Sequence, residues 1–360
     1  MKILVIGGTG AMGVHLVKIL AQQNHEVYVT SRSRSGREGN INFITGNAHD
    51  EYFLHQLLGE HWDGIVDFMV YSTSGFQKRI DYLLNATEHY MFISSSRVYA
   101  DSNTPITENS PRLLDVSKDK QYLNTDEYAL TKARQEDILF HNKYTNWTII
   151  RPYITYDTER LQLGVLEKED WLYRAVHGRA IVLAKDIQSK QTTLTSGKDV
   201  AMAMASLVGN TKALGEAFHI TTDDSLTWHE ASNIYQNTLR KHAINVEIVE
   251  QGLDDFLKWR IGTYQIIYDR LYNRVFDNSK IKQFVDTSNF ISPQKGLTLA
   301  LIDFLSTHPM KFKTPNWIEE ASKDRLTKQN TPLSEISGAK QKIKYRLFKT
   351  LPVVGRLMTK

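Results

Sequence analysis

A glycine-rich turn close to the start of the chain constrains the fold more than any other feature. The apolar run KILVI at residues 2 to 6 leads into GGTGAMG, and a helical pattern follows over 11 to 22. The turn spaces Gly7, Gly10 and Gly13 three residues apart. A short apolar run is typical of a parallel strand buried on both faces, and glycines after it let backbone N–H groups approach a pyrophosphate at the helix N-terminus. The turn therefore predicts a dinucleotide-binding unit, although ordinary tight strand–helix turns use glycines too.

Apolar runs alternate with helical patterns through the N-terminal half of the chain. Further strands are expected at 26 to 30, 41 to 44, 64 to 70, 91 to 94 and 147 to 152, and helices near 51 to 60 and 79 to 89. Alternation at a spacing of roughly 20–30 residues predicts an α/β fold with a doubly wound parallel sheet and ligands at the carboxyl ends of its strands. The polar stretch 101 to 124 is expected to be an insertion before a helix whose first turn falls at Thr125 to Tyr128.

Three parts are expected along the chain. Residues 1 to 152 should form the nucleotide-binding domain, and 153 to 310 mainly a smaller substrate-binding domain. Segments near 192 to 208 and 216 to 220 are expected to return to the main sheet. Hydrophobic periodicity is lost beyond about residue 309, so 311 to 360 is interpreted as an extension that ends in a basic tail.

The composition excludes several kinds of site. The chain has no cysteine, which rules out disulfides, thiolate zinc sites, iron–sulfur clusters and a cysteine nucleophile, and which fits a reducing compartment. Its 12 histidines show no ligand spacing, so no metal site is predicted. No apolar run approaches the ~18–20 residues that span a bilayer, and the apolar opening breaks too early for a signal peptide. A cytoplasmic protein is therefore expected.

Positive charge is concentrated at the C-terminal end. The chain has a net charge of +4, yet residues 338 to 360 hold seven Lys or Arg and no Asp or Glu, so the preceding body is net negative. A body of that sign does not favour nucleic-acid binding. In the tail, apolar residues recur at helical spacing between lysines, namely Ile343, Leu347, Phe348 and Leu351. Such a helix is expected either to lie peripherally on an anionic membrane or to dock on the protein itself or on a subunit, and a homodimer is left open.

The end of the second predicted strand indicates which dinucleotide is bound. An Asp or Glu there normally holds a ribose 2′-hydroxyl, whereas a 2′-phosphate needs cations. Ser31 and Arg32 occupy the position of the acid, with Arg34 and Arg37 close by. We therefore expect NADP to be preferred, with NAD as the alternative. The competing interpretation is that these arginines only solvate a loop.

A tyrosine, a lysine and a serine form the candidate catalytic set. Tyr128 and Lys132 are four residues apart, which places both on one helix face. A tyrosine titrates near ~10, so an ammonium and a helix N-terminus are needed to stabilise its phenolate at neutral pH. Ser94, Ser95 and Ser96 end a buried strand, where a hydroxyl can bind a substrate oxygen while the tyrosine passes the proton and a nicotinamide the hydride. The alternative is a serine-rich strand end that satisfies loose backbone groups.

The motifs GGTGAMG, ISSSRVY, YALTK and RPYITYD, in this order, resemble the extended short-chain dehydrogenase/reductase family, the NAD(P)-dependent epimerase/dehydratase group, over about residues 1 to 240. The resemblance implies a Rossmann domain, a C-terminal substrate-binding domain and a Ser-Tyr-Lys catalytic set. In that family the catalytic hydroxyl lies four residues before the tyrosine of a V-Y pair, which selects Ser95 beside Tyr128 and Lys132, and Pro152 is implied to line the nicotinamide. The expected cofactor-binding residues are Gly7, Gly10, Ala11, Met12, Gly13, Ser31, Arg32, Arg34, Asn47, Tyr128, Lys132 and Pro152.

Departures from the family pattern narrow the expected chemistry. Sugar-nucleotide 4,6-dehydratases of the family place Asp-Glu after the catalytic hydroxyl, where this chain has Ser96 and Arg97, so we reject that chemistry. Thr192 replaces an arginine that commonly binds the substrate diphosphate, which weakens the case for a nucleotide-diphosphate sugar. The resemblance implies an epimerase or reductase that transfers hydride at a hydroxyl or ketone carbon of a sugar-like small molecule, nucleotide- or lipid-linked.

One string supports a second hypothesis. DFMVY at 67 to 71 resembles a divergent branch that contains the chloroplast stem-loop-binding proteins, which keep the fold but are associated with RNA. A catalytically reduced RNA-binding protein is therefore the alternative. The retained Tyr128 and Lys132 and the net negative body argue against it.

Overall fold

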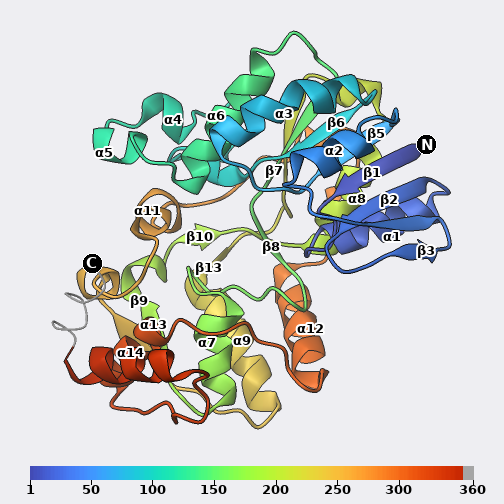
Figure 1. Ribbon diagram of the computed structural model, residues 1–360. Coiled ribbons are helices and arrows are strands. Elements are labelled where there is room, and N and C mark those ends of the chain that lie inside the picture. The colour runs from blue at the N-terminus through green and yellow to red at the C-terminus, as the bar shows by residue number, and fades with distance from the viewer. Residues whose placement is uncertain (352–360) are drawn as a thin grey trace. The chain divides into compact units, whose positions relative to one another are not determined.

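The computed structural model describes residues 1–351, and positions 352–360 of the expected basic tail lie outside the described residues. The chain forms two compact units, each built from three segments (Figure 1). Unit 1 comprises Met1–Asp157, Thr192–Ser225 and Asn273–Gly296. Unit 2 comprises Thr158–Gln191, Leu226–Tyr272 and Leu297–Lys360. None of the helices in the described range is long and apolar enough to cross a bilayer.

An eight-stranded sheet forms the centre of unit 1, in the order β12-β7-β6-β5-β1-β2-β4-β3 (Figure 1). Neighbouring strands are parallel except for the edge strand β3, which runs antiparallel to β4. The strands are β1 Lys2–Ile6, β2 Glu26–Ser31, β3 Gly36–Glu38, β4 Ile41–Thr45, β5 Gly64–Asp67, β6 Tyr90–Ile93, β7 Trp147–Pro152 and β12 Glu216–Ile220. The strand order reverses between β1 and β5, which is the switch point where doubly wound sheets bind ligands. This architecture confirms the predicted Rossmann fold.

Two apolar layers cover the faces of this sheet, because its central strands are buried on both sides. In β1, Ile3 and Val5 belong to one layer, and Leu4 and Ile6 belong to the other. Helices on both faces complete the layers: α1 Gly13–Gln22 and α8 Gly197–Leu207 on the first, and α2 Glu51–Leu57, α3 Thr73–Asn85 and α6 Tyr128–Phe140 on the second.

Three helices begin at positions that differ from the predicted ones. The first begins at Gly13 rather than residue 11, because the glycine turn occupies the intervening residues. The third runs over Thr73–Asn85 instead of 79 to 89, since Ser72 caps its N-terminus by accepting a backbone hydrogen bond. Helix α6 begins at Tyr128 rather than at residue 125, because the Glu127 side chain caps it in the same way.

Shorter elements complete unit 1. The insertion 101 to 124 contains two short helices, α4 Leu113–Val116 and α5 Lys120–Leu123. Strand β8 Ile154–Tyr156 pairs in parallel with β11 Leu194–Ser196. Residues 216–220 form β12 and belong to the main sheet. Residues 192–208 add no strand to the main sheet, because they contain β11, which pairs with β8, and the helix α8.

Unit 2 contains helices and a parallel pair of strands, β9 Ile181–Ala184 and β14 Ile248–Gln251. The α-helices are α7 Lys168–Val176, α9 Trp228–Lys241, α10 Leu253–Leu257, α11 Thr263–Gln265, α13 Trp317–Thr327 and α14 Ala339–Thr350. Three further elements lie at the ends of the segments that form the units: β10 Gln191–Thr192, β13 Leu226–Thr227 and α12 Pro293–Ser306.

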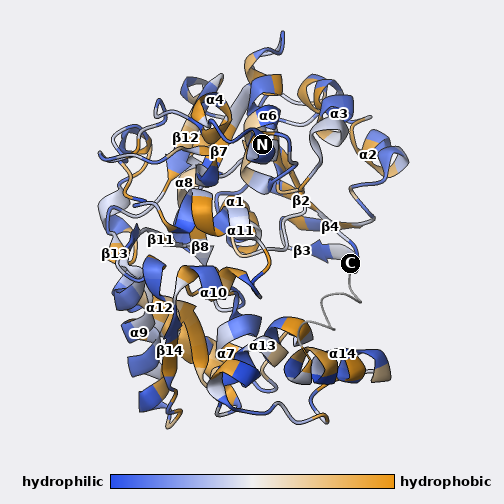
Figure 2. Ribbon diagram, turned by 90° about the vertical axis from the view of Figure 1, so that its left-hand side faces the viewer, coloured by the Kyte–Doolittle hydropathy of each residue, from blue (hydrophilic) through white to orange (hydrophobic). Residues whose placement is uncertain are grey.

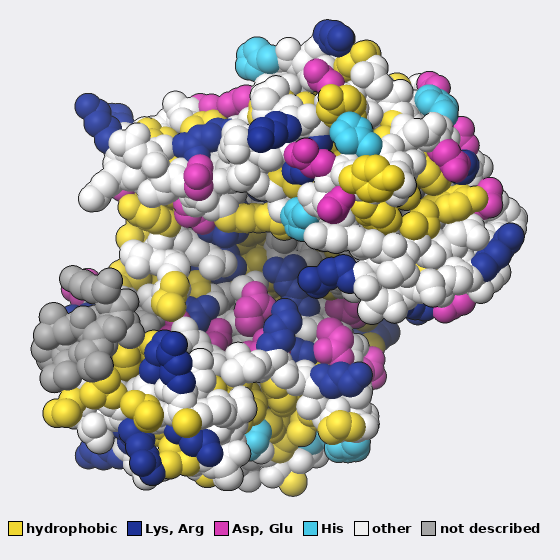
Figure 3. Space-filling model, in the orientation of Figure 1, with side chains coloured by type: hydrophobic (Ala, Val, Ile, Leu, Met, Phe, Trp, Pro, Cys, Tyr) yellow, Lys and Arg dark blue, Asp and Glu magenta, His cyan; other side chains and the backbone are white. Residues whose placement is uncertain are grey.

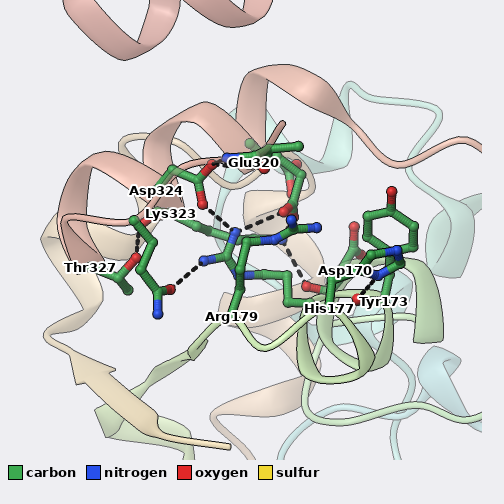
Figure 4. Close-up of polar contacts among 12 residues, drawn as sticks. Asp170, Tyr173, His177, Arg179, Glu320, Lys323, Asp324 and Thr327 are labelled. Atoms are coloured by element: carbon green, nitrogen blue, oxygen red, sulfur yellow. Dashed lines mark hydrogen bonds and ion pairs between the residues drawn. The ribbon is translucent and has the colours of Figure 1, made fainter. Parts of the chain in front are cut away.

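Helix α13 lies where the sequence showed no hydrophobic periodicity. Its buried side includes Glu320, Lys323 and Asp324, none more than 1% exposed. Figure 4 shows these side chains close to Asp170 and Tyr173 of α7 and to Arg179. A helix that buries paired charges does not produce an apolar stripe. Hydropathy therefore missed this helix.

Candidate active site

The glycines of the turn after β1 meet different constraints. Gly7 has a φ of +73°, and a Cβ there would lie 2.9 Å from the Met69 Sδ atom. A Cβ on Gly13 would lie 2.6 Å from the backbone of Gly8, whereas one on Gly10 would meet nothing within 4 Å. No side chain caps the N-terminus of α1. The turn is therefore tightly packed at Gly7 and Gly13, and it leaves space at Gly10 beside the uncapped N-terminus of α1. Such a turn fits the diphosphate of a dinucleotide.

The start of α8 packs against the same turn. A Cβ on Gly197 would lie 2.4 Å from the carbonyl oxygen of Ala11, and Met12 packs against the apolar layer to which α8 contributes. Only glycine allows the approach at position 197. The sequence motif did not reveal this residue, because the contact joins two distant parts of the chain.

The arginines after β2 differ in their surroundings. Arg34 forms an ion pair with Glu38 at 2.6 Å and lies 3.9 Å from the centre of the Phe43 ring. Arg37 donates from Nε to a backbone carbonyl at 2.8 Å. Arg32 is exposed and has no ion pair or hydrogen bond with any residue between 1 and 351. Arg34 and Arg37 thus bind groups close to them in the chain, whereas Arg32 forms no such contact within residues 1–351.

Ser31 and Asn47, two other residues expected to contact the cofactor, form hydrogen bonds within their own turns. The Ser31 hydroxyl oxygen accepts hydrogen bonds from the N–H groups of Ser33 and Arg34, at 3.3 and 3.2 Å. The exposed Asn47 accepts one from the N–H of His49 at 3.2 Å. Both side chains therefore shape the loops at the carboxyl ends of β2 and β4.

The three serines after β6 have different roles. Ser94 donates to Glu136 Oε1 at 2.6 Å, and Ser96 donates to the carbonyl oxygen of Arg151 at 2.7 Å. Ser95 caps the short 3₁₀ helix Ser96–Val98 by accepting the N–H of Arg97. Within the described part of the chain no group accepts a hydrogen bond from the Ser95 hydroxyl. Only Ser95 therefore keeps a hydroxyl hydrogen for another partner.

Lys132 connects α6 to the end of β6. Its side chain is 2% exposed, and its Nζ donates to the carbonyl oxygen of Ile93 at 2.8 Å. The same atom lies 6.0 Å from the centre of the Tyr128 ring. Burial lowers the pKa of Lys132 to about 8, while the negative charges of Asp67 and Glu136 oppose that shift. The lysine is thus a buried cation beside the candidate proton carrier.

A second cation lies near the same phenol. The guanidinium carbon of Arg97 is 5.4 Å from the centre of the Tyr128 ring. Arg97 also pairs with Glu127, the residue that caps α6. Tyr128 is 37% exposed, so its ring is accessible while the helix N-terminus and two cations surround it. The Tyr128 ring thus lies at the first residue of α6, within 6.0 Å of two cationic groups.

Buried charges that the sequence motifs did not reveal lie beside Ser94 and Lys132. Glu136, one helical turn after Lys132, is fully buried and binds Arg151 through both carboxylate oxygens at 2.8 Å. The Arg151 guanidinium also donates to the Tyr99 hydroxyl at 3.0 Å. The available signal in the sequence was an acid four residues after Lys132, because that spacing places both side chains on one helix face.

Asp67 is a second residue that sequence reasoning left without a role. It ends β5, is 1% exposed, and accepts hydrogen bonds from the hydroxyls of Tyr90 at 3.0 Å and Tyr71 at 3.4 Å. Burial raises its pKa, and Lys132 is among the groups that oppose this shift. An acid at the end of an otherwise apolar strand was the signal for it.

The sheet gathers the expected residues along one edge. The glycine turn follows β1, Ser95 follows β6, and the buried Pro152 ends β7. Because β1, β5, β6 and β7 are parallel neighbours, their carboxyl ends lie at the same edge. Across residues 1–351 no group of three or more ligating side chains could hold a metal ion.

The sequence model of the NAD dependent epimerase/dehydratase family matches residues 3–220, more than half of the chain. Among curated proteins, the chloroplast stem-loop binding protein of 41 kDa b from Arabidopsis thaliana is 28% identical over 249 residues, which cover 63% of this chain and 60% of that protein. The matched region thus spans less than two thirds of this relative's length.

Two further likenesses cover more of the chain. A UDP-N-acetyl-alpha-D-glucosaminuronate decarboxylase from Bacillus cytotoxicus is 21% identical over 324 residues, covering 82% of this chain and 95% of the decarboxylase. The solved structure of a UDP-glucuronic acid 4-epimerase from Bacillus cereus superposes with a TM-score of 0.64 at 15% identity, covering 85% of this chain and 99% of the epimerase. The structural likeness shows a shared fold.

Proposed function

Because the chain belongs to the NAD-dependent epimerase/dehydratase family, we propose that it is an NAD(P)-dependent epimerase or reductase that acts on a hydroxyl or ketone carbon of a sugar-like substrate. The observation that carries this proposal is the arrangement at the ends of β6 and α6. Ser95 is the serine with an uncommitted hydroxyl hydrogen, and Lys132 is buried within 6.0 Å of the Tyr128 ring centre. This arrangement supports a role for these side chains in proton transfer at a carbinol oxygen.

The cofactor is expected to bind along the carboxyl edge of the sheet. The turn residues Gly7, Gly10, Ala11, Met12 and Gly13 would hold the diphosphate. Asn47 would lie near the adenine, and Pro152 near the nicotinamide. A bound nicotinamide supplies the hydride acceptor or donor.

NADP is proposed as the preferred dinucleotide. The position that usually carries an acid for the ribose 2′-hydroxyl is Ser31, and the neighbouring Arg32 is exposed and has no bonded partner up to residue 351. A 2′-phosphate requires such a cation, whereas a carboxylate would repel it. NAD stays the alternative, since solved members of the fold contain it.

Tyr128, Ser95 and Lys132 would divide the proton chemistry. In the oxidative direction, the Tyr128 phenolate takes the proton of the substrate hydroxyl. Ser95 donates a hydrogen bond to that oxygen, and the positive charge of Lys132 stabilises the phenolate. Reduction reverses each role.

Relatives indicate the substrate class. The decarboxylase and the UDP-glucose 4-epimerase of Lactobacillus helveticus both carry nucleotide sugars in their names, which supports a sugar-like substrate. Ser96 and Arg97 stand where 4,6-dehydratases carry Asp-Glu, so epimerisation or net reduction is favoured over dehydration.

RNA binding is the second candidate, since one relative carries stem-loop binding in its name. The two candidates predict different ligands. The purified full-length protein should be denatured and any released dinucleotide identified, and NADPH and NADH should then be titrated by fluorescence. Dinucleotide binding supports the enzyme; RNA affinity without dinucleotide binding would support the alternative.

The catalytic assignment is tested with Tyr128→Phe. A panel of UDP-sugars serves as the set of substrates. The variant should lower turnover by about 10²–10⁴-fold, as expected for loss of a general acid–base group, while the Kd for NADPH is unchanged. Unaltered turnover would refute the role of Tyr128.

A further inference from the structure

The C-terminal helices of unit 2 separate their charges between buried and exposed positions. In α13, the acids Glu319, Glu320 and Asp324 are 2%, 1% and 0% exposed. Glu319 pairs with Arg260 at 2.6 Å, and Arg174 pairs with Glu320 and Asp324 at 2.8 and 2.9 Å. Figure 4 shows the inward direction of Glu320 and Asp324. These three negative charges are neutralised inside the unit.

The remaining acid of this region is also engaged. Between residues 317 and 351 the only other acid is Glu335, whose side chain is 17% exposed and binds Arg179 through both oxygens. The exposed charged side chains of the same region are all basic: Arg325, Lys328, Lys340 and Arg346. The surface that α13 and α14 present to solvent is therefore positive.

Helix α14 has a buried side and an apolar exposed side. Tyr345 and Phe348 pack into an apolar cluster with Trp317 and Ala321 of α13. The basic tail helix thus docks on its own unit through Phe348, which is one of the two alternatives expected for it.

The apolar side chains that remain outside are large. Ile343 is 66% exposed and Leu351 is 55% exposed. Figure 2 shows α14 alternating between hydrophobic and hydrophilic residues along its length. In Figure 3, basic and hydrophobic side chains gather at the lower left, the region of α14 in Figure 1.

We propose that the outer surface of α14, formed by Lys340, Ile343 and Arg346 together with Leu351 directly after the helix, docks on the surface of an anionic lipid bilayer. Exposed aliphatic side chains flanked by cations match a bilayer interface, where acyl chains receive the apolar groups and headgroup phosphates receive the charges. Nucleic acid would match the charges but would leave Ile343 and Leu351 in water. The mode is peripheral, because none of the described helices spans a membrane.

The test uses the full-length protein and sedimentation with vesicles of phosphatidylcholine, with or without phosphatidylglycerol. Pelleting should require phosphatidylglycerol and weaken as salt rises. The double variant Lys340→Gln/Arg346→Gln should lower the partition coefficient about 30-fold, since each cation near an anionic surface contributes roughly fivefold. Its matched control is Arg240→Gln/Lys241→Gln, which removes two exposed charges from α9 in the same unit.

A second pair of variants tests the apolar contribution. Ile343→Ser should lower partition about tenfold through lost apolar burial. Ile261→Ser is the control, because Ile261 is 71% exposed in the same unit but lies outside α13 and α14. Equal melting temperatures of all variants would exclude misfolding.

Three outcomes would overturn the proposal. The first is pelleting with phosphatidylcholine alone. The second is equal losses in test and control variants. The third is the absence of vesicle binding. Binding of a single-stranded RNA oligonucleotide that the α14 variants abolish would then assign the surface to nucleic acid.

Discussion

The Nζ atom of Lys132 lies 6.0 Å from the centre of the Tyr128 ring, one helical turn away on α6. Burial lowers the pKa of this lysine to about 8, against the opposing charges of Asp67 and Glu136. The ammonium is therefore charged at neutral pH and loses its proton on moderate alkalinisation. A mechanism that needs this charge should weaken as pH rises through that value.

Replacing Asp67 by Asn should shift the alkaline limb of the pH–rate profile to lower pH. A carboxylate at position 67 favours the charged form of Lys132, so its removal lowers the pKa of the lysine further. The measurement is kcat from neutral to alkaline pH. Tyr90→Phe removes one hydrogen bond to Asp67 and no charge, so the limb should stay in place; an unmoved limb in the Asn variant would show that Asp67 does not set the charge of Lys132.

Alanine substitutions at the three serines should separate catalysis from stability. Ser95→Ala should reduce kcat/KM by about 10²-fold or more through loss of a hydrogen bond to the reacting oxygen, and should lower stability by about 1 kcal/mol through loss of the cap on the short 3₁₀ helix. Ser94→Ala and Ser96→Ala should each cost about 1–3 kcal/mol of stability, because Glu136 and the carbonyl of Arg151 lose buried donors. Kinetics and thermal unfolding of the three variants check this division, which fails if Ser95→Ala keeps full activity.

Arg32→Ala should weaken NADPH binding by about 10–100-fold, the expected effect of losing a charge-assisted contact to a phosphate. NADH binding should be unaffected, since NADH lacks the 2′-phosphate. Arg37→Ala is the matched control, because Arg37 already donates to its own loop. Fluorescence titration of both cofactors measures the effect, and equal losses for NADPH and NADH would contradict it.

A buried histidine should make the fold less stable at acid pH. Burial lowers the pKa of His89 to about 4, from an ordinary histidine pKa of 6.5. The unfolded chain therefore binds a proton between these values that the folded chain does not, and the free energy of unfolding falls as pH drops through this window. Between pH 6.5 and about pH 4, His89 thus lowers the free energy of unfolding by about 1.4 kcal/mol for each unit by which the pH falls.

The His89 contribution can be isolated by substitution. His89→Gln should make the dependence of unfolding free energy on pH shallower by that amount below pH 6.5, as measured by denaturant unfolding. His242→Gln, at an exposed position after α9, should leave the slope as it is. Identical slopes in the His89 variant and the parent protein would disprove the assignment.

Local patterns predicted the sheet well. The strand expected at 147 to 152 matches β7, because the segment WTIIRP is rich in β-branched and aromatic residues and ends at Pro152. Helix α3 was displaced in the prediction, since the cap at Ser72 lies in a polar stretch that hydropathy does not mark. Motif spacing likewise located Tyr128 and Lys132 on one helix.

Contacts between distant residues were not predictable from the sequence alone. The pairing of Glu136 with Arg151 and the position of Asp67 near Lys132 depend on strand order, which no local pattern encodes. Hydrophobic periodicity did not predict α13, because several of the side chains that this helix buries are charged.

The enclosed pairing of Arg174 with Glu320 and Asp324 determines where the chain can be trimmed for expression. A truncation near residue 310, where periodicity suggested a boundary, would remove both carboxylates from a guanidinium that has no access to water. The same cut would take away α13 and α14, so unit 2 would lose the buried ion-pair network together with the apolar cluster that Tyr173 forms with these helices. Shortened versions should therefore retain at least the sequence through Thr327.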